Sequence, residues 1–211
     1  MKRNFFTKSV KLLVAAFVCF TPNSLWAVTE VNVETAGTLS TLLSNPDKEV
    51  KVMGVINGTD IKYLRQRVTA GTVTKLDWSE VCIVGGGDAY RDSYTTTANV
   101  IGEKMFEGCS NLQSIILPGN ITAIDGEAFA RSGLKSIDIP NSVTTIGFDA
   151  FAYCNSLTSV VIGKKVKNLN QGVFYGSAVS TVYAKPIVPP DTPAFFSALT
   201  RTVSSVYIQT P

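Results

Sequence analysis

The chain has 211 residues, of which 45% are hydrophobic and 17% are charged. This composition predicts one or two folded units and excludes an intrinsically disordered protein, which would be poorer in apolar residues. The sequence contains no histidine, which excludes Ser-His-Asp and Cys-His nucleophile systems together with histidine metal sites. We therefore expect a protein that is not an enzyme and that holds no metal or other cofactor.

Residues 1–27 have the pattern of a secretory signal peptide. Four basic and no acidic side chains precede an apolar run from Leu12 to Phe20, and the small residue Ala27 offers a cleavage point before Val28. The apolar run is too short to span a bilayer. A buried N-terminal helix is the alternative interpretation. We expect an exported protein located at the cell surface or outside the cell, with the periplasm as an alternative.

Removing this segment takes away four of the 19 basic residues and none of the 16 acidic residues, which leaves a formal net charge of minus one. A nearly neutral chain lacks the basic footprint of proteins that bind nucleic acid or anionic membranes. No later apolar segment predicts a transmembrane helix. Cys82, Cys109 and Cys154 remain, and because an odd number cannot form a complete disulfide framework, we expect free, buried thiols.

Residues 28–100 show no fixed period, and we expect them to form an α/β N-terminal cap. The spacing of apolar residues predicts helices and strands in alternation, at residues 38–43, 50–54, 60–68 and 73–78. Asp60 has the residue type of an N-cap, so the second helix is predicted to begin there. Three consecutive glycines, Gly85 to Gly87, and the following stretch to Asn99 are interpreted as a loop.

From Ile101 onward the sequence repeats every 22 to 23 residues, with units that start near residues 101, 124, 146, 169 and 191. A phenylalanine follows each unit's opening residue by five positions, at Phe106, Phe129, Phe151, Phe174 and, in the last unit, Phe196. This period is typical of a leucine-rich solenoid, in which each repeat makes one coil. The phenylalanines are predicted to form one continuous buried column.

Each unit then contains a short L-x-x-I-x-L pattern. The pattern starts at Leu112, Leu134, Leu157, Val179 and Val203. The apolar residues in the second half of the pattern are two positions apart, which predicts a short strand with one buried face. We therefore expect a right-handed solenoid that is mostly β-strand and loop and has a short parallel β-sheet on one face. Residue types that tolerate a left-handed backbone follow the openers, at Gly102, Asp125, Gly147 and Asn170.

Two of these units, IGEKMFEGCSNLQSIILPGNIT and IGFDAFAYCNSLTSVVIGKKV, resemble the BspA-like leucine-rich repeats of bacterial surface proteins. The resemblance covers the chain from about residue 99, and the segments TDIKYLR, KLDWS and GGGDAY resemble the cap that precedes such repeats. The resemblance implies an exported protein involved in adhesion, with host extracellular matrix or another bacterial surface molecule as partner.

The candidate binding residues are those that flank the middle apolar position of each strand and point away from the core. Stacking would align them in two rows, Ser114, Ser136, Ser159 and Thr181 in one and Ile116, Asp138, Val161 and Tyr183 in the other. The hydroxyl row is also consistent with a structural hydrogen-bond ladder. The varied row is also consistent with scattered surface residues that bind nothing.

The leading hypothesis is an exported, adhesion-type protein that binds a protein or glycan through the sheet face. One alternative is a structural spacer or assembly component of an envelope complex. Another is a glycan-active enzyme with a carboxylate pair, for which the candidates near predicted turns are Glu103, Glu107, Asp125 and Glu127.

Overall fold

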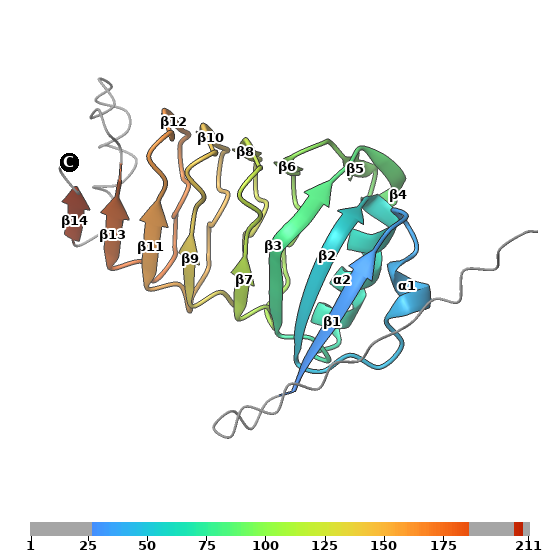
Figure 1. Ribbon diagram of the computed structural model, residues 1–211. Coiled ribbons are helices and arrows are strands. Elements are labelled where there is room, and N and C mark those ends of the chain that lie inside the picture. The colour runs from blue at the N-terminus through green and yellow to red at the C-terminus, as the bar shows by residue number, and fades with distance from the viewer. Residues whose placement is uncertain (1–26, 186–204, 209–211) are drawn as a thin grey trace, which may run out of the picture.

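The computed structural model describes residues 27–185 and 205–208. Apart from Ala27, the expected signal peptide lies outside the described residues, as do Phe196 and Val203 of the last predicted unit. The described chain forms a row of stacked coils with an α/β unit at one end (Figure 1). The repeat solenoid predicted from the period is therefore confirmed.

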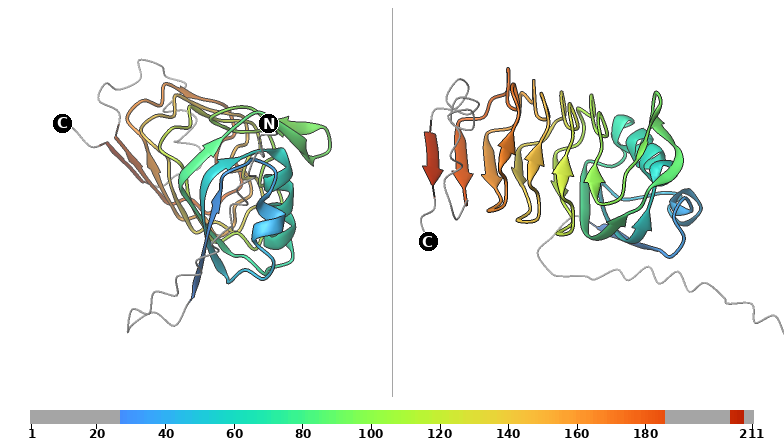
Figure 2. Two further views of the ribbon diagram at one scale, coloured as in Figure 1. Left: turned by 45° about the vertical axis from the view of Figure 1, so that its right-hand side comes forward. Right: turned by 90° about the horizontal axis from the view of Figure 1, so that it is seen from above.

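The N-terminal unit is a parallel sheet covered by two helices. Its strands β1 (Val28–Val33), β2 (Glu49–Ile56) and β3 (Lys75–Ile83) pair in that order. The helices α1 (Leu39–Leu42) and α2 (Gly58–Thr69) lie on the side of the sheet that the coils also occupy (Figures 1 and 2). Ile61, Leu64 and Val68 form the buried face of α2, as the helical spacing predicts.

Helix α2 begins earlier than the sequence pattern predicts. Asn57 is its N-cap residue and Asp60 occupies the third helical position, so the two form a capping box. The buried Asp60 carboxylate also accepts hydrogen bonds from the backbone N–H groups of Gly37 at 2.5 Å and Leu39 at 2.9 Å. The prediction that Asp60 is the N-cap is wrong, because its side chain joins the starts of both helices instead of capping only its own.

The glycine-rich segment is a β-hairpin, which corrects the predicted loop. Strand β4 (Gly86–Arg91) pairs antiparallel with β5 (Tyr94–Thr96). The hairpin packs against the first turn of α2, where a Cβ atom on Gly58 would lie 2.1 Å from the carbonyl oxygen of Asp88. Glycine is thus required by the close approach of two backbones.

The first four coils of the repeat region each contribute one short strand to each of two sides of the solenoid. The sheet on one side contains β6 (Val100–Ile101), β8 (Ala123–Ile124), β10 (Thr145–Ile146) and β12 (Asn168–Leu169). The strands of the other side are β7 (Ser114–Ile116), β9 (Ser136–Asp138), β11 (Ser159–Ile162), β13 (Thr181–Ala184) and β14 (Ser205–Ile208). The left view of Figure 2, nearly along the row, shows that the coils superpose.

Strands β7, β9, β11 and β13 carry the predicted rows of outward residues. Strand β7 pairs with β3, so the sheet of the N-terminal unit continues into the first coil. The ladder is interrupted between β7 and β9, where the N–H group of Lys135 donates to the carbonyl of Gln113 just before the two strands. Strands β9, β11, β13 and β14 then form a continuous parallel ladder.

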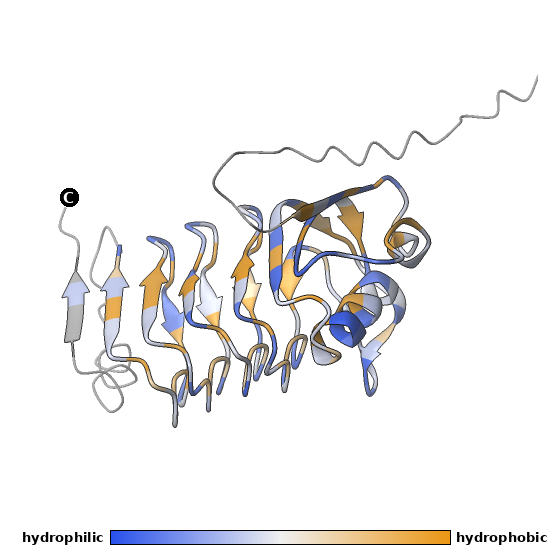
Figure 3. Ribbon diagram, turned by 90° about the horizontal axis from the view of Figure 1, so that it is seen from below, coloured by the Kyte–Doolittle hydropathy of each residue, from blue (hydrophilic) through white to orange (hydrophobic). Residues whose placement is uncertain are grey.

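The predicted phenylalanine column is present and lies in the centre of the stack. The rings of Phe106, Phe129, Phe151 and Phe174 are buried, with successive centroids 5.5, 5.2 and 5.7 Å apart. Trp78 of β3 extends the column into the N-terminal unit, 5.3 Å from Phe106. Figure 3 shows the same segregation more generally, with apolar stretches along the strands and polar residues concentrated in the turns. One hydrophobic core therefore spans the N-terminal unit and the coils.

Left-handed backbone occurs at different positions from those predicted. None of Gly102, Asp125, Gly147 and Asn170 has a positive φ angle. Positive angles fall three and seven residues after the openers, at Lys104, Glu127, Asp149 and Gly172 and at Gly108, Arg131, Tyr153 and Gly176. At Gly147 the glycine instead allows close contact, because a Cβ atom there would lie 2.5 Å from the backbone nitrogen of Gly126 in the neighbouring coil.

The three cysteines of the repeat region and its cap are free, as predicted. Cys109 and Cys154 are buried, whereas Cys82 is half-buried, which corrects the expectation for that residue. The Cys154 thiol donates to the carbonyl oxygen of Phe129 at 3.0 Å. Burial is the main cause that raises the pKa of the Cys109 and Cys154 thiols.

Candidate functional site

The strand register brings the predicted rows together on the outward face of the sheet. Val161 of β11 lies between Asp138 of β9 and Tyr183 of β13, and Tyr183 is followed by Tyr207 of β14. Ile116 of β7 belongs to the same row but pairs with Asp77 of β3, across the interruption described above. We name the exposed surface of β7, β9, β11, β13 and β14 the sheet face.

Two apolar side chains of the varied row are strongly exposed, whereas Val161 between Asp138 and Tyr183 is half-buried. Ile116 is 52% exposed and Tyr183 is 47% exposed, whereas the residue between each pair of outward positions is buried. Tyr207, which the sequence analysis did not single out, is 55% exposed and stacks on Tyr183 with ring centroids 5.3 Å apart. Exposed aromatic groups aligned in this way are typical of contact surfaces.

The hydroxyl row is aligned but does not form the structural ladder that the sequence also allowed. Ser136, Ser159 and Thr181 are adjacent in register, yet their hydroxyls make no hydrogen bond with one another among the described side chains. The ladder lies one residue earlier, where Thr158 donates to the carbonyl of Lys135 at 3.4 Å and Ser180 donates to that of Thr158 at 3.3 Å. The hydroxyls of Ser136, Ser159 and Thr181 therefore remain available to a ligand.

Towards the N-terminal unit the outward residues become charged. Lys75 of β3 pairs with Glu49 of β2 on one side and with Ser114 of β7 on the other. Lys51 of β2 pairs with Asp77 of β3. The Lys75 ammonium lies 3.2 Å from the Glu49 carboxylate. This end of the sheet therefore satisfies its charges internally, unlike the apolar and aromatic end formed by the later coils.

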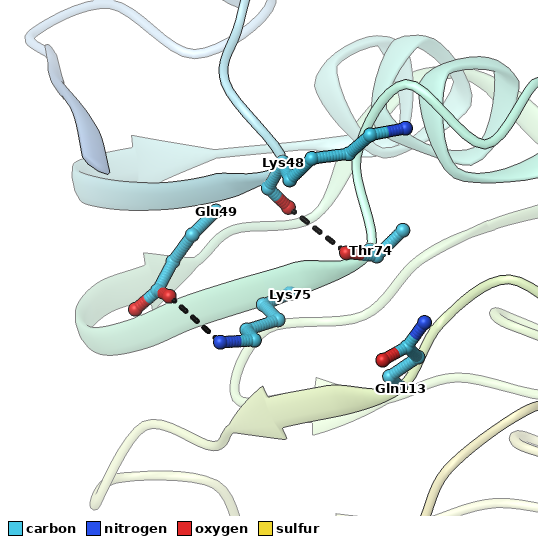
Figure 4. Close-up of a pocket in the computed structure, with 5 residues that line it drawn as sticks. All are labelled: Lys48, Glu49, Thr74, Lys75 and Gln113. Atoms are coloured by element: carbon cyan, nitrogen blue, oxygen red, sulfur yellow. Dashed lines mark hydrogen bonds and ion pairs between the residues drawn. The ribbon is translucent and has the colours of Figure 1, made fainter. Parts of the chain in front are cut away.

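A groove of about 360 Å³ lies at the amino-terminal ends of β2, β3 and β7. Its lining residues are Lys48, Glu49, Thr74, Lys75 and Gln113. Figure 4 shows that the Lys75 and Glu49 side chains meet, while the Thr74 hydroxyl donates to the carbonyl of Lys48 at 3.3 Å. In this wall the charges of Lys75 and Glu49 are paired with each other, whereas the Lys48 ammonium donates to the carbonyl of Gly71.

The four carboxylates of the enzyme hypothesis are held near the other side of the coils. Glu107 pairs with Arg91 at 2.9 Å and with Arg131 at 3.6 Å. Glu103 accepts a hydrogen bond from the Tyr94 hydroxyl at 2.9 Å, and Lys104 lies 3.6 Å from Glu127.

Asp125 is the fourth carboxylate and has a raised pKa, first because burial disfavours its charge and second because Glu103 is nearby. The other three carboxylates connect neighbouring coils and the hairpin, and none of the four lines the groove described above.

A second group of exposed aromatic residues was missed by the sequence analysis. Tyr153 and Tyr175 meet edge to face with centroids 5.4 Å apart, and the Arg131 guanidinium lies 4.9 Å from the Tyr153 ring. Phe148 is 61% exposed. These residues occupy the turns that follow β8, β10 and β12. Phe148, Tyr153 and Tyr175 lie two, seven and six residues after the openers of their units, so the repeat pattern gives no signal for them.

The described residues contain neither a cluster of metal-binding side chains nor a helix that could span a membrane. Within residues 27–185 and 205–208, no three or more acidic or cysteine side chains gather in a way that could hold a metal ion. In the same part of the chain, no helix combines the length and the apolar composition that crossing a bilayer requires.

Similar solved structures include a leucine-rich repeat protein of T. pallidum, with 22% identity over 73% of this chain and 51% of that one and a TM-score of 0.36. A leucine-rich repeat protein from Bacteroides ovatus has 20% identity over 85% of this chain and 43% of that one, with a TM-score of 0.42. A leucine rich cell surface protein from Faecalibacterium prausnitzii has 16% identity over 75% and 59%, with a TM-score of 0.32.

The chain spans about half the length of these solved structures. No match was found among curated proteins. A family model described as the BspA type leucine rich repeat region matches residues 93–192 with six copies. The stacked coils of Phe106 to Phe174 lie inside the matched region. Residues 93–192 are thus a BspA type leucine rich repeat region.

Proposed function

We propose that this protein is an exported interaction protein that binds a protein or glycan ligand through the sheet face. The observation that carries the proposal is the strip formed by Asp138, Val161, Tyr183 and Tyr207, which are adjacent in register and point away from the core. Stacked repeats create extended surfaces of this kind, on which neighbouring coils present different side chains at one position. The hydroxyls of Ser136, Ser159 and Thr181 run beside the strip and supply hydrogen-bonding groups.

The proposed location is the cell surface or the extracellular space. It is supported by the signal-peptide pattern of residues 1–27 and by the match of residues 93–192 to the BspA type leucine rich repeat region. In the same proposal, residues 28–100 serve as the cap that covers the first coil. Pairing of β3 with β7 and contact of Trp78 with Phe106 support this role.

The experiment that tests the function is a binding screen of the purified protein against arrays of extracellular-matrix proteins and glycans. Tyr183→Ala removes a half-exposed ring from the sheet face, and Phe148→Ala removes an exposed ring from a turn outside it. We expect Tyr183→Ala to weaken binding of any ligand found, and we expect Phe148→Ala to leave it unchanged. Equal loss in the two variants would assign the ligand to another surface.

A screen without any ligand would favour the structural alternative, in which the coils act as a spacer within an envelope complex. Turnover of a polysaccharide by the wild-type protein, lost in Glu107→Gln, would favour the carboxylate-based enzyme. Neither outcome is expected, because Glu107 already pairs with two arginines and the apolar strip on the sheet face has no role in a spacer.

A further inference from the structure

Charge is strongly segregated along the chain, although the total is nearly neutral. Residues 28–149 contain ten basic and fifteen acidic side chains, a net charge of minus five. Residues 150–190 contain four lysines and no acidic residue, a net charge of plus four. The ion pairs found in the described part of the chain all join residues between positions 49 and 131. The four lysines thus lack a carboxylate partner among the described residues.

Three of the four lysines lie at the carboxyl-terminal ends of neighbouring strands. Lys164 and Lys165 form the turn that follows β11, whereas Lys167 directly precedes β12; all three are exposed. Lys185 directly follows β13, and its N–H group donates to the carbonyl of Ile162 at 2.9 Å. This bond continues the β11–β13 ladder by one residue and places Lys185 in the coil next to that of the other three (Figure 1).

The lysines adjoin the aromatic end of the sheet face. Tyr183 points outward from β13, and Lys185, the residue that follows the strand and the buried Ala184, is half-buried. The residue beside Lys185 in the ladder is Gly163, which has no side chain to cover it. Tyr183 in turn stacks on Tyr207 at an interplanar angle of 18°. We name this surface the lysine–tyrosine face; its members are Lys164, Lys165, Lys185, Tyr183 and Tyr207.

We propose that the lysine–tyrosine face binds an acidic polysaccharide built of uronic acids. This inference rests on the function proposed above and names the class of ligand. Lysine ammonium groups pair with carboxylates, and the tyrosine hydroxyls form hydrogen bonds with sugar hydroxyls. A polyuronate carries one carboxylate on each sugar ring. Adjacent coils are about 4.8 Å apart, close to the length of one pyranose ring, so successive carboxylates can meet successive coils.

The arrangement of the tyrosines favours a sugar polymer over a single-stranded nucleic acid. Binding of single strands relies on open aromatic faces on which bases stack. Here Tyr183 and Tyr207 lie nearly parallel at 5.3 Å and cover one face of each other. The pair therefore leaves at most one face of each ring open and offers two phenolic hydroxyls, which suit a ligand rich in oxygen atoms.

Substitution of Asp138 tests the proposal through the direction in which the affinity for the ligand changes. It lies on the same row of the sheet face, separated from Tyr183 by Val161. Its charge repels an anionic chain that extends along the row, so Asp138→Ala should strengthen binding of a polyuronate. For a neutral or cationic ligand of the sheet face the same substitution would leave binding unchanged or weaken it.

The test measures affinity of the purified protein for polygalacturonate, with neutral dextran, poly-L-glutamate and single-stranded DNA as comparison polymers. Lys164→Ala/Lys165→Ala is compared with Lys62→Ala/Lys135→Ala, which changes the net charge equally at exposed sites away from the lysine–tyrosine face. We expect the first pair to lower affinity for polygalacturonate about tenfold and the second pair to leave it within about twofold. Raising NaCl from about 50 mM to about 500 mM should weaken binding of the wild-type protein.

Each contrary result has a distinct meaning. No binding to polygalacturonate, or equal loss in the two lysine pairs, would overturn the assignment of the lysine–tyrosine face. Equal affinity for poly-L-glutamate or DNA would overturn the assignment to a polysaccharide. If either result accompanied another ligand whose binding Tyr183→Ala weakens, the sheet face would keep its proposed function and only its ligand class would change.

Discussion

The rings of Phe129 and Phe151, which belong to successive coils, lie face to face with centroids 5.2 Å apart and an interplanar angle of 6°. Both rings are fully buried. The contact joins residues 22 positions apart in the sequence, so it exists only when two coils superpose. The column as a whole ties the stability of each coil to that of its neighbours.

Phe151→Ala should lower the free energy of unfolding by about 3 to 5 kcal/mol, because it leaves a cavity between two stacked rings. The matched control is Phe148→Ala, three residues earlier, whose ring is 61% exposed. It should change stability by no more than about 0.5 kcal/mol. Chemical denaturation of the two variants measures the difference, and similar midpoints would contradict the stacked column.

Gly147→Ala should destabilise the protein by about 1 to 3 kcal/mol through steric overlap. The new Cβ atom would lie 2.5 Å from the backbone nitrogen of Gly126 and 2.6 Å from the carbonyl carbon of Asp125. Gly119→Ala is the control, since no heavy atom lies within 4 Å of its added Cβ. Thermal melting should show a lower midpoint for Gly147→Ala and an unchanged or slightly higher one for Gly119→Ala.

Asp125→Asn should stabilise the protein at neutral pH but not in acid. Burial and the charge of Glu103 raise the pKa of the Asp125 carboxyl in the folded chain above its ordinary value of 3.8. A raised carboxyl pKa means that ionisation opposes folding. The wild-type protein therefore loses stability as the pH rises from the ordinary pKa through the raised pKa of the folded chain. The difference between variant and wild type should therefore be present at pH 7 and disappear below the ordinary pKa.

Melting temperatures recorded across this pH range test the prediction, with Asp138→Asn as control. Asp138 is exposed on the sheet face. A gain for Asp125→Asn that persisted unchanged into acid would contradict the role of ionisation.

Alkylation by iodoacetamide should modify Cys82 well before Cys109 and Cys154 in the native protein. Cys82 is half-buried, whereas the other two thiols are buried and burial raises their pKa, which lowers the fraction of reactive thiolate. Peptide mapping by mass spectrometry identifies the modified residue. Equal labelling in denaturant serves as the control, and early labelling of Cys154 in buffer would show that the coils open locally.

The repeat architecture was predictable because its signal recurs. The spacing of Phe106, Phe129, Phe151 and Phe174 predicted the column, and the L-x-x-I-x-L pattern predicted which residues of β9, β11 and β13 face outward. Each apolar position of the pattern recurs several times within one chain, and a chance match to the pattern would not recur in every unit.

Features that occur once, or that depend on contacts between distant segments, were not predictable in the same way. Strands such as β8 contain two residues and show no alternation, so the second sheet was missed. The choice between Asn57 and Asp60 as N-cap depends on where the Asp60 carboxylate finds its donors, which include Gly37 far away in the sequence. The hairpin of β4 and β5 was missed because a run of glycines is typical of a loop, whereas Gly86 and Gly87 lie within a strand and have positive φ angles.

The candidate site was predicted only in part. The rows follow from the strand pattern, but the stack of Tyr207 on Tyr183 requires the register of β13 and β14. The lysines between positions 164 and 185 are plain in the sequence, yet the nearly neutral total charge concealed them. A net charge averages over the whole chain, whereas a ligand responds to the groups within about 10 Å of it.

The aromatic column also sets how such a molecule can change in size. Within the column, each ring stacks only on the ring before it and the ring after it. Duplication of one 22-residue unit would therefore insert a further ring without disturbing the others. Reach would then grow in increments of one ring spacing, 5.2 to 5.7 Å between Phe106 and Phe174, while the chemistry of each existing coil stayed the same. Gene-level gain or loss of a unit thus offers a route to new specificity that leaves the fold intact.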